Sequence, residues 1–287
     1  MSWPDCGANS ANTIIFISYR ESIILTYRES ASWKKKKRLL RCITTAVFKK
    51  SPGIFKSEHL EPYGGIKANL DSYWAQRYQI FSKYDEGVWL TDDAWFGVTP
   101  EPVANKIAAQ MAESAPAGRM ILVDAFAGAG GNTIAFALTG KWKRIYAIEK
   151  NPAVLKCAKH NAKIYGVQDK ITWFEGDCFE ILQKQLKDLA PYSVIFASPP
   201  WGGPGYRSDQ VFNLKTMEPY SLQRLYDEYS VFSKHMVLFI PRTSNLKQIA
   251  KLVPEGQKNM VMHYCMEGAS KALCIFYGDF DVARLSQ

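Results

Sequence analysis

Beyond residue 118 the chain alternates between short runs of apolar residues and segments in which apolar residues recur at helical spacing. The apolar runs predict strands over residues 120–126, 144–149, 170–174, 193–197 and 236–240. The helical spacing predicts helices over residues 132–138, 151–165, 179–186, 220–232 and 246–252. Two more apolar runs predict a closing antiparallel pair of strands over residues 260–266 and 272–277. This order is typical of a doubly wound, mostly parallel α/β sheet of seven strands, whose ligands bind at the carboxyl ends of the strands.

The segment before the sheet reads as a small helical lobe. Aromatic and apolar residues recur at helical spacing over residues 63–81 and predict an amphipathic helix. A second helix is predicted to begin after Thr99 as the N-cap, with Pro100 in its first position. We therefore assign residues 61–117 to an N-terminal helical lobe.

Residues 1–60 differ from the rest in charge. They hold 11 of the 36 Lys and Arg residues but only 4 of the 27 Asp and Glu residues, which places +7 of the formal net charge of +9 here. The basic run Lys34–Arg38 suits a solvated tail, and equally a segment that meets nucleic acid or an import receptor. We expect a basic, disordered tail over residues 1–60.

Composition narrows the class of protein. The 287 residues are 47% hydrophobic and 22% charged, as in an ordinary globular protein. No long uncharged apolar run is present, so we expect no membrane-spanning helix. Six cysteines without a C-x-x-C pair, together with four histidines, lead us to expect no metal site.

A glycine-rich turn over residues 124–133 follows the first predicted strand of the sheet and opens a helix. Gly128 and Gly130 allow the backbone to turn tightly and approach a ligand. Glu149 ends the second strand, a position from which an acid commonly holds ribose hydroxyls. Asp177 follows the third strand, where it could meet an adenine amine. The alternative is that both acids only cap helices.

The same turn disfavours a dinucleotide. It lacks the G-x-G-x-x-G spacing that holds a pyrophosphate, and Asp124 at the strand end would repel phosphate. A cationic, phosphate-free nucleoside fits better, so the expected cofactor is S-adenosylmethionine.

Ser198-Pro199-Pro200-Trp201 follows the fourth predicted strand. This resembles the motif of methyltransferases that act on the exocyclic amines of bases. The two prolines stiffen the turn, so that the Ser198 hydroxyl and backbone carbonyls can accept hydrogen bonds from an amine. The Trp201 ring can then stack on the base. The alternative is a structural proline-rich turn followed by a core tryptophan.

The choice of tryptophan favours a charged base. Its ring gives the strongest cation–π contact, and 7-methylguanine carries a positive charge whereas guanine does not. A preference of about 1–2 kcal/mol corresponds to a factor of roughly 5 to 30 in affinity.

Several motifs together resemble the trimethylguanosine synthase family over residues 63–280. The motifs are WFGVTPE at 95–101, DAFAGAGGNT at 124–133, SPPWGGPGY at 198–206, FIPR at 239–242, and Lys271 followed by FYGD at 276–279. The resemblance implies a class I, Rossmann-like S-adenosylmethionine-dependent methyltransferase domain over residues 118–287. It implies an enzyme that transfers two methyl groups, one at a time, to the exocyclic amine of the 7-methylguanosine cap of small nuclear and small nucleolar RNAs.

The resemblance also implies roles for individual residues. Ser198, Pro199 and Trp201 match the catalytic positions around the amine. The residues matching cap-binding positions are Trp201, Tyr206, Arg242 and Lys271. The residues matching cofactor-binding positions are Thr99, Asp124, Phe126, Gly128, Gly130, Asn132, Thr133, Glu149 and Asp177. Glu149 stands where relatives usually have Asp, and Ser72 stands where relatives can carry a Lys for the cap phosphates.

The resemblance further implies capped small nuclear and nucleolar RNA as the partner, with small ribonucleoprotein core proteins in addition. It implies a nuclear location, with the nucleolus and some cytoplasm. Two other functions remain open from the residues: methylation of an internal base in RNA or DNA, and cap binding without catalysis. The presence of Asp124, Glu149, Asp177 and Ser198 together favours catalysis. We expect His160 and His263 to be structural and not general bases.

Overall fold

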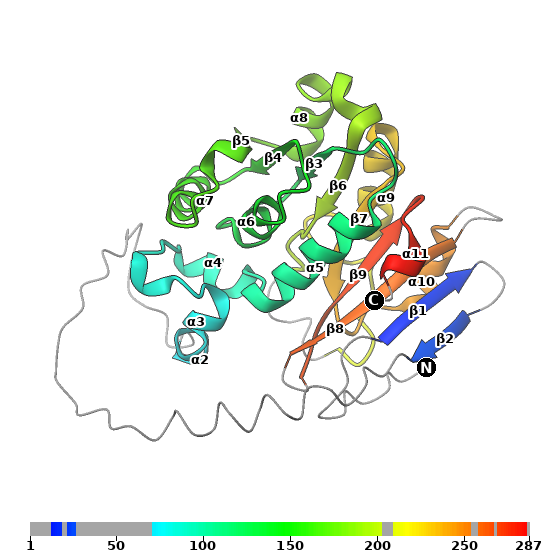
Figure 1. Cartoon of the computed structure of the whole chain (residues 1–287). Coiled ribbons are helices and arrows are strands. Elements are labelled where there is room, and N and C mark those ends of the chain that lie inside the picture. The colour runs from blue at the N-terminus through cyan, green and yellow to red at the C-terminus, as the bar shows by residue number, and fades with distance from the viewer. Residues whose placement is uncertain are drawn as a thin grey trace.

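The predicted alternation of strands and helices is present in the computed structural model, which describes residues 13–18, 22–26, 71–202, 209–253, 258–266 and 269–285. Within this part of the chain the strands form one sheet in the order β2-β1-β8-β9-β7-β6-β3-β4-β5 (Figure 1). The parallel strands are β3 Ile121–Asp124, β4 Arg144–Glu149, β5 Ile171–Glu175, β6 Ser193–Ala197 and β7 Met236–Pro241. The antiparallel strands are β8 Lys258–Met266 and β9 Ala269–Tyr277, with β1 Thr13–Ser18 and β2 Ser22–Thr26 beyond them. The predicted fold class is confirmed.

The order in which the chain adds strands reverses between the parallel neighbours β3 and β6. From β3 the chain order runs outward through β4 to β5 on one side, and β6 leads to β7 on the other. Such a reversal opens a crevice at the carboxyl ends of the two central strands. It therefore marks the place where a ligand would lie.

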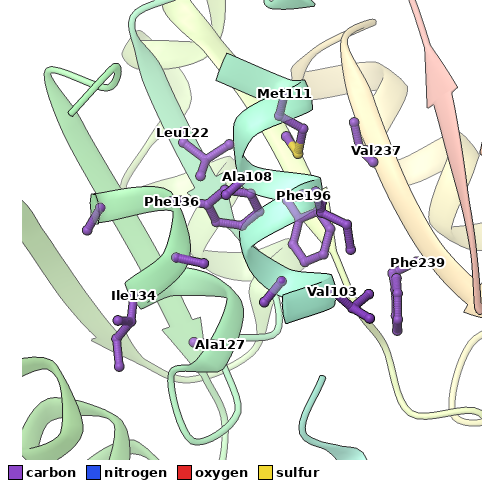
Figure 2. Close-up of a cluster of buried hydrophobic side chains, with 14 of the residues drawn as sticks. Val103, Ala108, Met111, Leu122, Ala127, Ile134, Phe136, Phe196, Val237 and Phe239 are labelled. Carbon is purple, nitrogen blue, oxygen red and sulfur yellow. The ribbon is translucent and has the colours of Figure 1, made fainter. Parts of the chain in front are cut away.

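Helices cover both faces of the sheet. Neighbouring residues of one strand point to opposite faces, so that Leu122 and Val123 enter different hydrophobic clusters. Figure 2 shows the first cluster, in which Met111, Phe136 and Phe196 meet between two helices and the sheet. The helices of this face are α5 Glu101–Ser114, α6 Gly131–Leu138 and α7 Pro152–Ile164. The helices of the other face are α8 Cys178–Lys184, α9 Leu222–Phe232 and α10 Leu246–Lys251. Short 3-10 helices η3 Gln168–Lys170 and η4 Lys187–Tyr192 precede β5 and β6, and α11 Val282–Leu285 ends the described chain.

The helical lobe differs in detail from its prediction. The helix expected over residues 63–81 is two short helices, α2 Asp71–Ala75 and α3 Arg77–Ile80, and residues 63–70 lie outside the described part. Next come η2 Tyr84–Glu86 and α4 Asp92–Gly97. Thr99 is not the N-cap of α5 as predicted, because Pro100 holds that position. The Thr99 hydroxyl instead contacts Asn132 at the glycine-rich turn.

Two strands fall within the predicted tail. β1 pairs antiparallel with β8, with Ile15 opposite Val261, and β2 pairs with β1. Disorder throughout residues 1–60 is therefore wrong for residues 13–18 and 22–26, whose runs of β-branched residues favour extended backbone. The rest of the tail lies outside the described residues, and the domain boundaries stay a prediction. Among the described helices, none is both long and apolar enough to cross a bilayer.

Candidate active site

Polar side chains gather where the parallel strands end. β3 ends at Asp124 and β4 at Glu149, while Asp177 lies two residues beyond the end of β5. Ser198 follows the end of β6, across the reversal of strand order. The residues predicted for the cofactor and those predicted for the substrate thus come to one edge of the sheet from its two halves.

The glycine-rich turn needs its glycines for geometry. Gly128 and Gly130 have φ values of 54° and 94°, in the left-handed region. A Cβ on Gly130 would lie 3.3 Å from the Ala158 Cα, so a side chain there would press on the backbone of α7. The turn can therefore lie directly against α7, and it is open at Gly128, where no atom lies within 4 Å of the place a Cβ would take.

Glu149 holds the turn from the neighbouring strand. Its Oε2 accepts a hydrogen bond from the Gly128 N–H at 2.9 Å, and its Oε1 accepts one from the Asn151 N–H at 2.8 Å. Asn151 is the N-cap of α7. The carboxylate thus joins the turn to the start of α7, so the helix-capping role left open above is part of its function. Each carboxylate oxygen retains a further lone pair that ribose hydroxyls could use.

Asp124 lies beneath the turn and is fully buried. The Thr133 hydroxyl donates to its Oδ2 at 2.5 Å, and the Phe126 N–H donates to its Oδ1 at 3.3 Å. Burial raises the pKa of Asp124 from 3.8 to about 7, against the lowering effect of the Thr133 hydrogen bond. In this structure Asp124 shapes the turn from inside.

One buried atom beside the turn has an unused hydrogen-bonding capacity. The Asn132 Nδ2 donates to the Thr99 hydroxyl at 3.0 Å, whereas the Asn132 Oδ1 is buried and accepts no hydrogen bond from the described residues. Buried acceptors are rarely left without a partner in a complete site. The orphaned oxygen and the open backbone of the turn fit a ligand that donates hydrogen bonds, such as an amino-acid moiety with a charged amine.

Asp177 has two hydrogen-bond partners and one ion-pair partner. It caps α8 by accepting from the Phe179 N–H at 3.0 Å, and its Oδ2 accepts from the Tyr220 hydroxyl at 3.0 Å. Lys150 Nζ lies 3.8 Å from the same oxygen. Burial and the hydrogen bond to Asp177 raise the pKa of Tyr220 to about 12, so its hydroxyl stays protonated. Asp177 is therefore both a capping acid and part of the wall of the site.

Tyr220 was not predicted from the sequence. Its ring centroid lies 6.3 Å from that of Phe126 and 4.9 Å from that of Phe179, and the Arg224 guanidinium lies 4.9 Å from its centroid. It brings an aromatic surface from the chain before α9 to the end of β5. Only its aromatic identity could have drawn attention to it, because nothing in its spacing links it to Asp177.

The turn Ser198-Pro199-Pro200-Trp201, which follows β6, holds its tryptophan in place. Pro199 is buried and Ser198 is half-buried. The Trp201 Nε1 donates to the backbone oxygen of Phe239 at 3.2 Å, and the two rings lie 5.6 Å apart with an interplanar angle of 32°. The half-buried indole contacts both hydrophobic clusters. Its orientation is thus fixed by packing and by one hydrogen bond, as a stacking platform requires.

Two more of the predicted cap-binding residues, Arg242 and Lys271, lie at the same edge. Arg242 directly follows β7, and its guanidinium donates to the Ser270 oxygen at 3.5 Å. Lys271 lies near the start of β9, next to the Ala272 that pairs with Pro241. Tyr206 lies outside the described residues.

The described histidines are engaged in structural contacts. The Nε2 of His160 lies 2.9 Å from the Gly87 oxygen, and the Nε2 of His263 lies 2.6 Å from the Ser270 hydroxyl. Burial lowers the pKa of His263 to about 4. No group of His, Cys, Asp and Glu within the described ranges could hold a metal ion.

The chain is similar to known methyltransferases in sequence and in fold. The chain is 37% identical over 210 residues to the trimethylguanosine synthase of Schizosaccharomyces pombe, covering 72% of this chain and 85% of that protein. It is 32% identical over 231 residues to the trimethylguanosine synthase of Saccharomyces cerevisiae, covering 78% and 72%. Among solved structures, the methyltransferase domain of METTL16 superposes with a TM-score of 0.51 at 14% identity, covering 76% of this chain and 100% of that one. A methyltransferase of Porphyromonas gingivalis superposes with a TM-score of 0.54 at 16% identity, covering 73% and 48%. At such identities the structures support the fold alone.

A family model described as RNA cap guanine-N2 methyltransferase matches residues 119–280. This confirms the predicted resemblance, the predicted enzyme class and its dependence on S-adenosylmethionine. The chain belongs to the family of RNA cap guanine-N2 methyltransferases.

Proposed function

We propose that this enzyme methylates the exocyclic amine of the 7-methylguanosine cap of small nuclear and small nucleolar RNAs, giving 2,7-dimethyl- and then 2,2,7-trimethylguanosine caps. The observation that carries the proposal is the position of Trp201. It directly follows the Ser198-Pro199-Pro200 turn and is held over the carboxyl edge of the sheet by its hydrogen bond to Phe239. A flat cationic base stacked on this ring has its amine next to the stiff turn.

The residues at and after the ends of β3, β4 and β5, across the reversal of strand order from Trp201, suit the methyl donor. Glu149 is the candidate for the ribose hydroxyls, Asp177 for the adenine amine, and the Asn132 oxygen for the amino-acid end. When bound, S-adenosylmethionine supplies an electrophilic methyl group on a sulfonium. The buried Asp124 and its hydrogen bond from Thr133 keep the turn in shape for this ligand.

On the substrate side, the chain contributes orientation. The Ser198 hydroxyl and the Pro199 carbonyl accept hydrogen bonds from the amine, which turns its lone pair out of conjugation and toward the methyl carbon. A new N–C bond forms as the C–S bond breaks, and the amine proton passes to solvent. Arg242 and Lys271 provide cationic groups for the cap phosphates. Most of the acceleration then comes from proximity and orientation.

The partners and location follow from the same substrate. Capped small nuclear and nucleolar RNA would be met in the nucleus, with the nucleolus and cytoplasm as further sites. Core proteins of the small ribonucleoproteins are the proposed protein partners.

The test is a methylation assay on two matched substrates, the 7-methylguanosine cap dinucleotide and its unmethylated guanosine twin, read by product mass. We expect one and then two added methyl groups on the first substrate alone. Equal methylation of both would contradict the stacking of a charged base on Trp201. Methylation of neither, with activity only on polynucleotides, would point to an internal base. Binding of the cap without methylation would point to a non-catalytic protein.

Variants at Trp201 sharpen this assay. Trp201→Ala should abolish detectable methylation and leave the affinity for S-adenosylhomocysteine, measured by calorimetry, nearly unchanged. Trp201→Phe keeps a ring but weakens the cation–π contact, so the preference for the 7-methylated substrate should shrink, by less than the factor of roughly 5 to 30 that the whole contact provides. Near-normal turnover by the alanine variant would overturn the stacking role.

A further inference from the structure

Helix α7 forms the wall on which the glycine-rich turn rests. The Gly128 N–H is tied through Glu149 to Asn151 at the start of the helix. About two turns along the helix, Ala158 leaves space that only a glycine at position 130 can use. The turn therefore lies directly against α7.

Helix α7 also contacts residues 87–91 of the helical lobe, which we call the crossing segment. This segment joins η2 to α4 without regular structure, and its Val88 and Leu90 side chains are buried in the first hydrophobic cluster. Trp89 is half-buried beside the same cluster and stacks on His160 with ring centroids 3.6 Å apart and an interplanar angle of 6°. The His160 Nε2 also contacts the Gly87 oxygen at 2.9 Å.

One side chain reaches both the turn and the crossing segment. Asn161 is fully buried in α7. Its Oδ1 accepts from the Trp89 N–H at 2.8 Å, and its Nδ2 donates to the Trp89 oxygen at 2.9 Å and to the Ala129 oxygen at 3.0 Å. The amide thus pairs with Trp89 as a neighbouring strand would, and uses its remaining hydrogen atom on the turn.

This arrangement is sensitive to small movements. The amide has a fixed planar shape, so a shift of the turn that pulls on Nδ2 also moves both hydrogen bonds to Trp89. All three contacts are buried or partly buried, where an unpaired backbone group is costly. Nothing about the turn alone requires this particular partner, because Glu149 and Asp124 already hold it.

The crossing segment in turn positions the lobe. It leads into α4, where Trp95 is buried with its ring 5.8 Å from Tyr84 and 6.1 Å from Trp74 of α2. Whether the crossing segment is ordered or mobile therefore affects the positions of the lobe helices.

We propose that Asn161 is a positioning residue through which cofactor binding at the glycine-rich turn orders residues 87–91 and thereby the helical lobe. The inference concerns the cofactor side of the site and does not depend on which RNA is methylated. According to this proposal, binding of the cofactor and ordering of the helical lobe are linked in the absence of RNA substrate.

Amide hydrogen exchange tests this directly on the full chain. S-adenosylhomocysteine added to the wild-type protein should slow exchange in the peptide covering residues 87–91 by about 5-fold or more, the lower range of typical coupling between sites. In Asn161→Ala the peptide should exchange at the same rate with and without the ligand, at ligand concentrations that saturate the variant. The Trp89 amide is the most informative probe because its own hydrogen bond goes to Asn161.

Leu155→Ala is the matched control. Leu155 is also buried on α7, but its side chain has no polar atom. This variant should lose stability by cavity formation and still show the ligand-dependent protection. If Asn161→Ala does not fold, Asn161→Ser serves in its place, since its hydroxyl cannot bridge both segments.

Two results would overturn the proposal. One is ligand-dependent protection of residues 87–91 that persists in the Asn161 variant. The other is a wild-type protein in which saturating S-adenosylhomocysteine leaves this peptide unchanged. Failure of the cap methylation assay would affect neither result, so the two proposals are tested separately.

Discussion

At the scale of single residues, the most unusual group is the buried carboxyl of Asp124. It lies under the glycine-rich turn, and it is held by one hydroxyl and one backbone N–H. A fully buried acid costs free energy when it ionises. Its presence therefore makes folding stability depend on pH.

The sign of this dependence follows from proton binding. Burial raises the pKa of Asp124 from 3.8 to about 7. Between these values the folded protein keeps a proton that the unfolded chain releases, so the free energy of unfolding falls as pH rises through this window and then levels off. Burial lowers the pKa values of His235 and His263 to about 4, which gives the opposite slope below about pH 6.5.

Asp124→Asn should remove the Asp124 contribution and leave those of the histidines. We expect the melting temperature of the variant, relative to wild type, to rise between about pH 5 and about pH 8. The comparison is made by thermal unfolding of both proteins in the same buffers, so that the histidine contributions cancel. A difference that stays constant across this range would show that Asp124 ionises normally in the folded protein.

Among the predicted site residues, some could be placed from sequence alone because they stand next to a strand end. Asp124, Glu149 and Ser198 end or follow runs of buried residues, and strand ends at one edge must come together. Tyr220 and Asn161 could not be found this way. Their partners, Asp177 and Ala129, lie 43 and 32 residues away along the chain, and no periodic pattern records such contacts.

At the scale of elements, the glycine-rich turn packs closely against α7. Gly130 combines a φ of 94° with a spacing of only 3.3 Å between the place a Cβ would take and the Ala158 Cα. Both features argue against any other residue, but they act differently. The backbone conformation affects stability, whereas the close contact displaces the turn itself.

A pair of substitutions separates these effects. Gly140 has a φ of 68° and no neighbour within 4 Å of a Cβ, so Gly140→Ala carries only the conformational cost of about 1–2 kcal/mol. Gly130→Ala should lose at least as much stability and also bind S-adenosylhomocysteine more weakly, by roughly tenfold for about 1.4 kcal/mol of lost contact energy. Thermal unfolding and calorimetric titration measure the two quantities. Equal ligand affinities in the two variants would mean that the turn adjusts to the added methyl group.

Element boundaries were predictable where the sequence around an apolar run marks its ends. β4 and β6 have the predicted bounds, Arg144–Glu149 and Ser193–Ala197, because polar or turn-forming residues flank each apolar run. The lobe was less predictable. Its aromatic residues recur at helical spacing across Gln76, where the structure breaks the helix, because packing of Trp74 on Trp95 and Tyr84 decides the path there.

At the scale of the whole molecule, the sheet does not end at the pair that closes the predicted fold. β1 covers the edge of β8, whose Val261 and Met262 are fully buried, and β2 covers β1. An uncovered strand edge tends to pair with other chains. The segment expected to be a tail therefore covers the edge of the nine-residue β8 and leaves the five-residue β2 as the outermost strand.

Removal of residues 1–60 should expose this edge and cause concentration-dependent association, seen by size-exclusion chromatography with light scattering. Removal of residues 1–12 alone keeps both strands and should leave the elution profile unchanged. If the larger truncation elutes and melts as the full chain does, β1 and β2 do not protect the sheet.

The reversal of strand order has one more consequence, for how such an enzyme can diversify. Everything proposed to hold the methyl donor comes from β3, β4, β5 and the chain around them, whereas the proposed base and phosphate contacts come from the ends of β6, β7 and β9. Apart from the lobe, the residues proposed for the methyl donor and those proposed for the base and phosphates therefore lie in separate stretches of the sequence. Exchanging the loops after β6 and β7 could therefore redirect the enzyme to another amine while the residues proposed to hold the methyl donor stay unchanged.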